Sequence, residues 1–272
     1  MLGALSAGEL VLALAHAEPG SRWTASASAV TATAASGDGW TLSGVKEPVP
    51  QGARADRLVV SAALPDGGTG LFLVDPDASG VGRDGYATHD GGRAARISLD
   101  STPAEPLGEA GVDLTPTIAA VRDIARVMAC NEAIGAMEVA LDATTSYLTS
   151  RKQFGVTLNT FQALNFRAAD MYVSLELAKS VTLWATMVIA AGKPEAMAEA
   201  ASRAALQVSR AGRHIGQEAI QLHGGIGMTA EYSIGSYTSR LTALDHLLGD
   251  GDHHLRRLSA TVGDHEEVDP LP

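Results

Sequence analysis

Residues 117–150 are the stretch that most restricts the fold, because they contain no proline and a single glycine, Gly135. A run of this length without helix breakers is typical of a long helix. Thr115 and Pro116 come just before it, as a residue able to cap a helix and a proline suited to its first position. The sequence therefore predicts one long helix that ends at residue 150, with Gly155 closing the turn that follows.

Three further helices are predicted downstream. The second covers about residues 159–191, where "AGKPEA" ends it with Gly192 as the stop and Pro194 as the start of the third helix. The third runs to about Leu222 and a fourth spans about residues 236–248, while a continuation after Gly251 stays open. Long helices joined by short loops predict an antiparallel four-helix bundle over residues 113–262.

The first 112 residues differ from the rest of the chain in their residue pattern. Short segments rich in β-branched residues alternate with Gly, Asp and Pro turns, a pattern typical of β-strands. These segments are residues 22–36, 39–47, 56–65, 69–76 and 95–100. We therefore predict an α+β chain with a small antiparallel β-sheet or barrel over residues 1–112, the bundle over residues 113–262, and an acidic tail over residues 263–272.

Composition excludes several classes of protein. The net charge is −11 and no Lys/Arg cluster occurs, so we predict no nucleic-acid partner. Cys130 is the only cysteine, which rules out a disulfide within the chain and predicts a buried small hydrophobic residue. The N-terminal segment lacks the basic region of a signal peptide, and no uninterrupted apolar run reaches roughly 18 residues. We expect a cytoplasmic protein without a membrane segment.

Two short motifs carry the functional signal. "RKQFG" (residues 151–155) joins cations, an aromatic residue and a glycine stop directly after the long helix, and Phe161 and Gln162 follow it. "QLHGG" begins at Gln221, and its glycines let backbone N–H groups approach a phosphate without a Cβ in the way. The same glycines also suit the C-terminal cap of a helix. A glycine turn by itself therefore leaves a ligand site and a helix cap both open.

Taken together, the spacing of "RKQFG", "FQ" and "QLHGG" resembles the acyl-CoA dehydrogenase family. The segments "HAEPGS" (residues 16–21), "DGWTLSGVK" (residues 38–46) and "DIARV" (residues 123–127) extend the resemblance over essentially the whole chain. The resemblance implies a small β-domain followed by a helical bundle, FAD as the cofactor and an acyl-CoA as the substrate. The family usually opens with a helical domain, and this chain, which begins almost at "AEPG", is expected to lack it.

In that family the motif residues reach across a dimer interface and hold the adenosine-diphosphate part of the FAD of the neighbouring subunit. The resemblance gives this role to Arg151, Gln153, Phe154, Phe161, Gln162, Gln221, Leu222, His223, Gly224 and Gly225. The planar guanidinium of Arg151 suits a pyrophosphate because it can make two parallel hydrogen bonds. Packing at helix ends is the alternative role for Phe154 and Phe161. Arg126 matches an arginine of the family's substrate site.

The chain departs from the family where the flavin ring and the catalytic base are expected. Ala17 and the "PVP" of residues 48–50 stand where the family has hydroxyl and N–H donors for the ring, which alanine and proline cannot supply. Ala125 occupies one of the family's two glutamate positions and cannot accept a proton. Asp250 is the carboxylate nearest the other position. It is either the catalytic base or a turn residue in "GDGD".

Three hypotheses follow. The first is a non-catalytic or half-site subunit of a heteromeric enzyme, as in actinobacterial members of the family, whose FAD is held by a full-length acyl-CoA dehydrogenase-like partner. The second is a self-sufficient homo-oligomer that uses Asp250 as its base. The third is a cofactor-free scaffold or regulatory subunit. We predict no metal site, because His246 and residues 252–254 lack a convincing ligand spacing and better suit a helix cap or a subunit contact.

Overall fold

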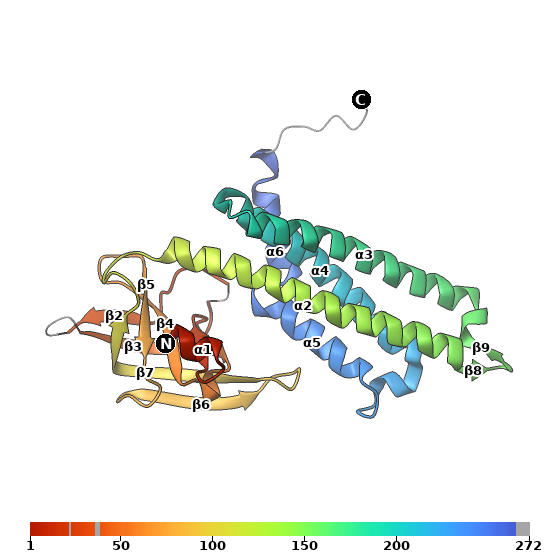
Figure 1. Cartoon of the computed structure of the whole chain (residues 1–272), viewed down its shortest axis with the longest axis horizontal. Coiled ribbons are helices and arrows are strands. Elements are labelled where there is room, and N and C mark those ends of the chain that lie inside the picture. Colours follow the sequence, from red (N-terminus) through yellow and green to blue (C-terminus); the bar gives the residue numbers. More distant parts are fainter. Residues whose placement is uncertain (22, 36–38, 265–272) are drawn as a thin grey trace. The chain divides into compact units, whose positions relative to one another are not determined.

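The computed structural model describes residues 1–21, 23–35 and 39–264 (Figure 1). The chain divides into two compact units between Ala119 and Ala120, near the start of the long helix α2 (Thr115–Ser150). The first unit is a β-domain and the second is built from helices. The predicted α+β class and the order of its two parts are therefore confirmed.

The described part of the β-unit contains seven strands and the short helix α1 (Leu2–Ser6). The strands are β1 (Leu12–Ala15), β2 (Thr31–Ala34), β3 (Trp40–Pro50), β4 (Arg57–Ala63), β5 (Thr69–Val74), β6 (Val81–Ala87) and β7 (Arg93–Pro106). Strands β4, β2, β3, β7 and β5 pair in that order, and β5 pairs again with β4. These five strands close into a barrel, with β1 added at β4 and β6 added at β7.

The prediction of a wholly antiparallel sheet is wrong at two pairings, because β1 and β2 both run parallel to β4. Strands β1 and β6 were also not predicted. The "LALA" of β1 has no β-branched residue, and the exposed β6 contains Gly82 and Gly85, which are poor strand formers. Of the strand predicted over residues 22–36, only β2 is regular. Residues 22 and 36 of this predicted strand, and residue 38 of the "DGWTLSGVK" motif, lie outside the described residues.

A buried ion pair lies inside the β-unit. Lys46 is fully buried, and its Nζ donates to Glu18 Oε1 at 2.8 Å and to Ser61 Oγ at 3.0 Å. Glu18 also accepts backbone N–H groups of residues 28, 29 and 30. Burial by itself raises the pKa of Glu18, but the hydrogen bonds from Lys46 and the backbone outweigh it and lower this pKa to about 2. Glu18 thus joins a loop to β3 through a carboxylate that is charged at neutral pH.

The helical unit contains α2, α3 (Gln162–Ala190), α4 (Pro194–His223), α5 (Ile234–Leu247) and α6 (Gly251–Ala260) (Figure 1). The four predicted helices are present. Helix α3 begins later than predicted, because the 3₁₀ turn η2 (Leu158–Thr160) occupies the expected start. The chain turns at Gly249, which has a φ of 122°, before α6 continues it. The chain therefore does continue as a helix after Gly249, from Gly251 onward.

The start of α2 differs in detail from the prediction. Thr115 is the first residue of the helix, and its N–H and hydroxyl both donate to Asp113 Oδ1. Asp113 also accepts the N–H of Thr69 at 2.9 Å, so one carboxylate links this segment to β5. At the other end of the chain, η4 (Val262–Asp264) closes the described part, and the predicted acidic tail beyond it lies outside that part.

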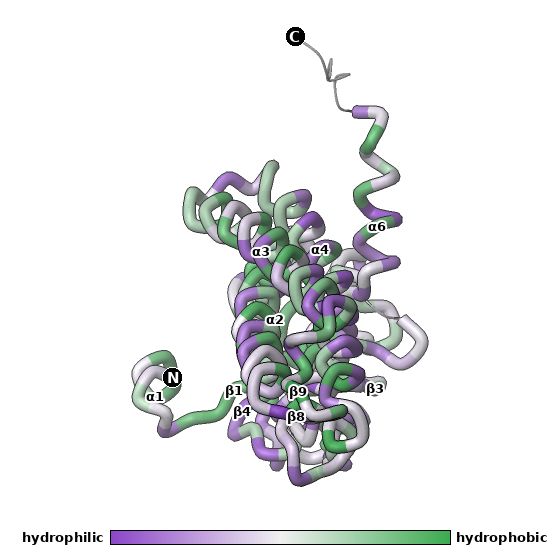
Figure 2. Tube along the Cα trace, turned by 90° about the vertical axis from the view of Figure 1, so that its right-hand side faces the viewer, coloured by the Kyte–Doolittle hydropathy of each residue, from purple (hydrophilic) through white to green (hydrophobic). Residues whose placement is uncertain are grey.

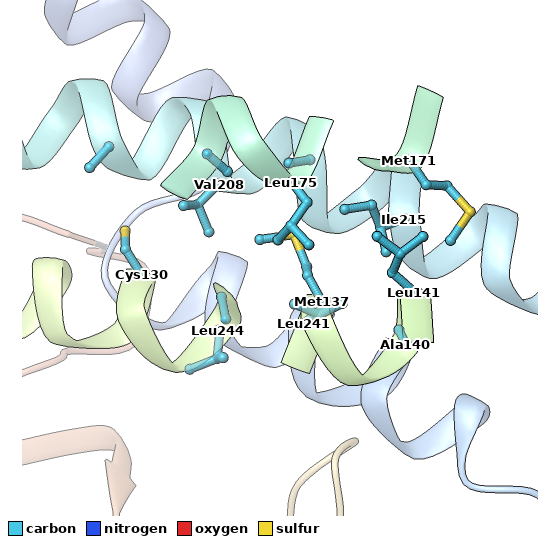
Figure 3. Packing of buried hydrophobic residues seen from close by; sticks show 14 of the residues in the cluster. Cys130, Met137, Ala140, Leu141, Met171, Leu175, Val208, Ile215, Leu241 and Leu244 are labelled. Carbon is cyan, nitrogen blue, oxygen red and sulfur yellow. The ribbon is translucent and has the colours of Figure 1, made fainter. Parts of the chain in front are cut away.

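Alanine supplies much of the core of the helical unit, which lets neighbouring helices approach closely. Larger side chains from several helices fill the remaining space, among them Met137, Met171, Leu175 and Ile215 (Figure 3). Cys130 is buried in this core as predicted, and burial raises the pKa of its thiol to about 12. A thiol with such a pKa stays protonated and does not act as a nucleophile at neutral pH.

Helix α3 is long and apolar enough to cross a membrane by length and composition alone, although a core helix of a soluble protein can pass the same test. Only 22% of its most apolar stretch is buried within the chain. Apolar residues recur along α3 in the hydropathy colouring of Figure 2.

Candidate functional site

The two sequence motifs meet at one end of the helical unit, although about 70 residues separate them. "RKQFG" follows the last turn of α2 and supplies β8 (Lys152–Gln153) and the turn of a hairpin, whose other strand is β9 (Val156–Thr157). "QLHGG" lies at the end of α4. Together with neighbouring side chains, the motifs line a cavity of about 300 Å³. Its lining residues are Tyr147, Arg151, Gln153, Leu158, Leu164, Arg167, Gln221, Leu222, His223 and Gly224.

The hairpin has an unusual tip. Phe154 has a φ of 54° and Gly155 a φ of 82°, so both central residues are in the left-handed region that a tight two-residue turn needs. Glycine adopts this conformation freely, whereas phenylalanine does so at a cost. The Phe154 side chain is 91% exposed and touches Phe161 edge-on, with 6.2 Å between ring centres. The chain thus holds an exposed aromatic pair beside the cavity.

The two arginines of the cavity differ in their partners. Arg167 forms an ion pair with Glu218 of α4 at 2.5 Å. Arg151 is exposed, and among the described residues its guanidinium has no ion pair or side-chain hydrogen bond. Gln153 donates to the carbonyl of Lys152 at 2.8 Å, which leaves its own carbonyl oxygen as an acceptor. The cavity therefore offers one uncommitted cation and amide groups for polar contacts.

His223 lines this cavity, and its ring contacts two tyrosine rings. Its ring stacks on Tyr147 with 4.6 Å between ring centres, and it lies 4.9 Å from the ring of Tyr232. Its Nδ1 lies 2.7 Å from the carbonyl of Ala219, and this contact requires the Nδ1–H tautomer. The ring is 3% exposed, and its Nε2 has no hydrogen-bond partner among the described residues. This contact and the two tyrosines therefore fix the His223 ring.

The glycine turn is a helix cap whose outer side is open. Gly224 has a φ of 65° and its N–H bonds to the end of α4, so it is a helix cap. No atom lies within 4 Å of a Cβ built on Gly224 or Gly225, so the outer side of the turn is open. Gly225, Phe154, Phe161 and Gln162 do not line the cavity.

A second cavity, of about 170 Å³, lies among α2, α4 and α5 and is lined mainly by apolar residues and by Arg126. Arg126 is 4% exposed and donates from Nε and Nη2 to the carbonyl of Leu248, at 3.1 and 2.8 Å. It also forms an ion pair with Asp123, which Arg257 approaches at 3.5 Å. The guanidinium of Arg126 therefore makes its hydrogen bonds and its ion pair within this chain.

Asp250 lies two residues beyond the carbonyl that Arg126 holds. Its carboxylate caps α6 by accepting the N–H of His253 at 2.8 Å, and it does not line the second cavity, although Gly249 does. The structure thus brings the predicted substrate arginine and the predicted base into one neighbourhood. In the structure, the Asp250 carboxylate makes a helix-capping contact.

The buried cluster around Arg126 was not predicted from the sequence. Arg122 and Asp123 are also buried, and Arg257 of α6 reaches the same carboxylate. Burial, reinforced by Arg126, His253 and Arg257, lowers the pKa of His254 to about 3, so this buried ring is neutral. The spacing of Arg122 and Arg126 by four residues could have indicated a shared helix face. Among the described residues, no group of three His, Cys, Asp or Glu could hold a metal ion.

Comparison with known proteins identifies the family. Residues 118–263 match the family described as "Acyl-CoA dehydrogenase, C-terminal domain". This chain belongs to the acyl-CoA dehydrogenase family. It is 32% identical over 240 residues to the mitochondrial short-chain specific acyl-CoA dehydrogenase of Bos taurus, an alignment that covers 83% of this chain and 56% of that protein. The chain therefore spans little more than half the length of this curated relative.

Other similar proteins include two from Mycobacterium tuberculosis and a steroid ACAD. Acyl-CoA dehydrogenase IpdE2 of Mycobacterium tuberculosis is 38% identical over 174 residues, covering 62% of this chain and 48% of that protein. A variant of the Tcur3481-Tcur3483 steroid ACAD has a TM-score of 0.85 and 34% identity, covering 97% of this chain and 70% of that chain. The ChsE4-ChsE5 complex of M. tuberculosis, at 22% identity and a TM-score of 0.83, covers 97% of this chain and 69% of its own and supports the fold alone.

The acyl-CoA dehydrogenase motif residues that the structure places around the first cavity fit an adenosine-diphosphate group. Arg151 offers a guanidinium without a partner among the described residues, Gln153 and Gln221 offer amides, and Gly224 keeps the backbone accessible. This donor set matches a pyrophosphate with its ribose hydroxyls.

The segments expected at the flavin ring do not fit it. The structure brings them together, because the N–H of Glu47 donates to the carbonyl of Ala17 at 2.8 Å. Ala17 has no hydroxyl, and Pro48 and Pro50 have no N–H to donate. The fit to the cofactor is therefore uneven along the chain.

Proposed function

We propose that this chain is a subunit of a heteromeric, FAD-dependent acyl-CoA dehydrogenase, in which it holds the adenosine diphosphate of a FAD whose flavin lies in a partner subunit. The observation that carries the proposal is the meeting of "RKQFG" and "QLHGG" around one cavity that contains the uncommitted Arg151. The lack of ring donors at Ala17, Pro48 and Pro50 supports the division of labour.

When bound, FAD supplies the hydride acceptor for α,β-desaturation of an acyl-CoA. The residues of this chain contribute binding and orientation. Arg151 would donate charge-assisted hydrogen bonds to pyrophosphate oxygens, and the amides of Gln153 and Gln221 would bind hydroxyl groups. The exposed pair of Phe154 and Phe161 offers an aromatic surface for packing against adenosine.

The partner we propose is an acyl-CoA dehydrogenase-like chain that carries the flavin-ring donors and a catalytic base. The similar steroid ACAD named above is a pair of different chains, which supports this assembly for a relative of 34% identity. The substrate class proposed here is a saturated acyl-CoA thioester.

An absorbance spectrum at about 450 nm, where a flavin absorbs, tests the proposal on the chain purified alone and after co-expression with candidate partners. The expected result is little flavin in the chain alone and stoichiometric flavin in the complex. Stoichiometric flavin in the chain alone would instead favour the homo-oligomeric enzyme. Absence of flavin from every complex would favour the scaffold.

The self-sufficient enzyme is kept as a second candidate because Asp250 lies beside Gly249 at the edge of the second cavity. It predicts that Asp250→Asn abolishes dehydrogenase activity without loss of flavin. Asparagine caps a helix about as well as aspartate, so this change removes the proton acceptor and keeps the cap.

A further inference from the structure

The second cavity is lined by a carboxylate whose buried oxygen has no hydrogen-bond partner in the described part of the chain. This carboxylate is Asp245 of α5, and the buried oxygen is its Oδ1. Its Oδ2 lies 3.9 Å from Arg213 Nη2 and 3.8 Å from His246 Nδ1, and both distances are too long for a hydrogen bond. His246 Nδ1 donates instead to the carbonyl of Thr242 at 3.0 Å. A buried acceptor such as Asp245 Oδ1 is normally satisfied by a donor.

The inner lining of the same cavity is apolar. Six buried side chains from three helices line the space, and four of them are labelled in Figure 3. They are Cys130 and Ala133 of α2, Ala205 and Val208 of α4, and Leu241 and Leu244 of α5. A lining of this kind favours a ligand with a compact hydrocarbon body, because binding removes apolar surface from water.

The volume of the cavity limits the size of that ligand. At about 170 Å³, the cavity is close to the roughly 150 Å³ of an apolar cavity that holds benzene. It is smaller than the roughly 300–1,000 Å³ of pockets that take drug-sized ligands. One six-membered ring with a single substituent therefore suits this space, whereas a whole acyl-CoA does not.

The charges around the cavity favour a neutral ligand. Arg126 is paired with Asp123, and the guanidinium of Arg213 partly offsets the charge of Asp245. A cationic ligand would add charge beside two arginines, and an anionic ligand would approach the unpaired oxygen of Asp245. A hydroxyl group donates a hydrogen bond without adding charge.

We propose that the second cavity binds a compact, neutral ring compound whose hydroxyl group donates to Asp245 Oδ1 and whose ring contacts the apolar lining. Among the described residues, none lines both this cavity and the adenosine-diphosphate cavity, and Asp250 lines neither. The site is therefore separate from the cofactor contact proposed above. Leu248 and Gly249 line it, so an occupant would contact the turn that precedes Asp250.

Phenol, toluene and cyclohexylammonium test the proposal, because each consists of one six-membered ring and one substituent. Calorimetric titration of the purified chain, and of its complex with a partner, should show saturable binding of phenol with a Kd on the order of 1 mM or tighter. Phenol should bind more tightly than toluene although it is less apolar, because only phenol can donate to Asp245. This comparison uses the unchanged chain and does not depend on the folding of a variant.

The variant Asp245→Leu isolates the hydrogen bond. It removes the acceptor and keeps a side chain of similar size, so phenol binding should weaken by about 10- to 100-fold. Toluene binding should become no weaker. The matched control is Asp142→Leu, which changes an exposed aspartate of α2 outside the cavity and should leave both affinities unchanged. Circular dichroism checks that both variants fold.

Methyl NMR of the chain locates the ligand. Titration with phenol should shift the methyl signals of Val208, Leu241 and Leu244, which line the cavity. The signals of Leu148 should not move, because this buried leucine belongs to the same core and does not line the cavity. Shifts confined to methyl groups outside the cavity would overturn the assignment of the site.

Three other results would overturn the proposal. Toluene binding as tight as phenol binding, with neither changed by Asp245→Leu, would mean that the cavity recognises no polar group. Tighter binding of cyclohexylammonium than of phenol would mean that the site takes a cation. Absence of phenol binding would mean that water satisfies Asp245 Oδ1. The variant Arg151→Ala should leave phenol binding unchanged, so failure of the cofactor proposal can be told apart from failure of this one.

Discussion

Arg126 and Arg151, one at each cavity of the helical unit, differ in their partners. Arg126 is buried, and its donors are satisfied by the carbonyl of Leu248 and by Asp123. Arg151 is exposed and has no such partner among the described residues. A buried cation that is satisfied within its own chain stabilises the fold, whereas an exposed one beside an open turn is available to a ligand. The difference separates two arginines that the family resemblance both placed in binding sites.

The largest expected effect on stability comes from replacing the buried arginine, Arg126. Arg126→Met removes the donors to Leu248 and leaves Asp123 buried with less compensation. Breaking a buried pair in this way costs about 3–5 kcal/mol. Urea unfolding of the variant should show this loss of stability. A loss below about 1 kcal/mol would mean that Arg126 is held for substrate binding and contributes little to the fold.

The β-unit contains a second buried charge that is paired within the chain, the Glu18 carboxylate. The pKa of Glu18 is lowered from 4.5 to about 2 in the folded chain, so its contribution to stability is complete above pH 4.5 and is lost as the pH falls toward 2. We expect a loss on the order of 2 kcal/mol from this group over that range.

Unfolding measured between pH 6 and pH 3 checks this expectation. Glu18→Gln cannot titrate, so the variant should be less stable at pH 6 and should lose less stability on acidification. An unchanged acid slope in the variant would show that other carboxylates cause it.

Asp250 should show an effect of intermediate size on stability. Asp250→Ala removes the cap of α6 and should cost about 1 kcal/mol, while Asp250→Asn should cost much less. Thermal unfolding of both variants measures the difference. If both variants are equally stable, the capping contact is not what holds Asp250 in place.

Much of the helical half could be predicted from the sequence, because Gly192, Pro194 and Gly155 mark its breaks and long runs without such residues mark its helices. The parallel pairing of β1 and β2 with β4 could not, since it depends on how the barrel closes. Strand β6 was missed because its glycines and charges obscure a strand held by pairing with β7.

The candidate site was predicted in part. The motif residues Arg151, Gln153 and Gln221 indicated the cavity through their family resemblance. Tyr147 and Arg167, which also line it, belong to neither motif. Tyr147 lies one helical turn before Arg151, a spacing that places two residues on the same face and could have suggested it. The ambiguity at Asp250 between a base and a turn residue reflects its position at a helix start, where a carboxylate suits either role.

The smallest expected change in stability belongs to Arg151, and it accompanies the largest change in cofactor binding. Arg151→Ala should alter the free energy of unfolding by no more than about 0.5 kcal/mol, because nothing in the described chain depends on its guanidinium. Loss of a charge-assisted contact worth about 1.5–3 kcal/mol should weaken FAD binding to the complex by roughly 10- to 100-fold.

The most direct test of the account is an FAD titration of the purified heteromeric complex with Arg151→Ala, beside the control Lys152→Ala. Lys152 is the adjacent exposed cation and does not line the cavity. The account predicts that FAD affinity falls at least about tenfold for Arg151→Ala and stays unchanged for Lys152→Ala. Equal affinity for FAD in both variants would contradict a role of this chain in holding the cofactor of its partner.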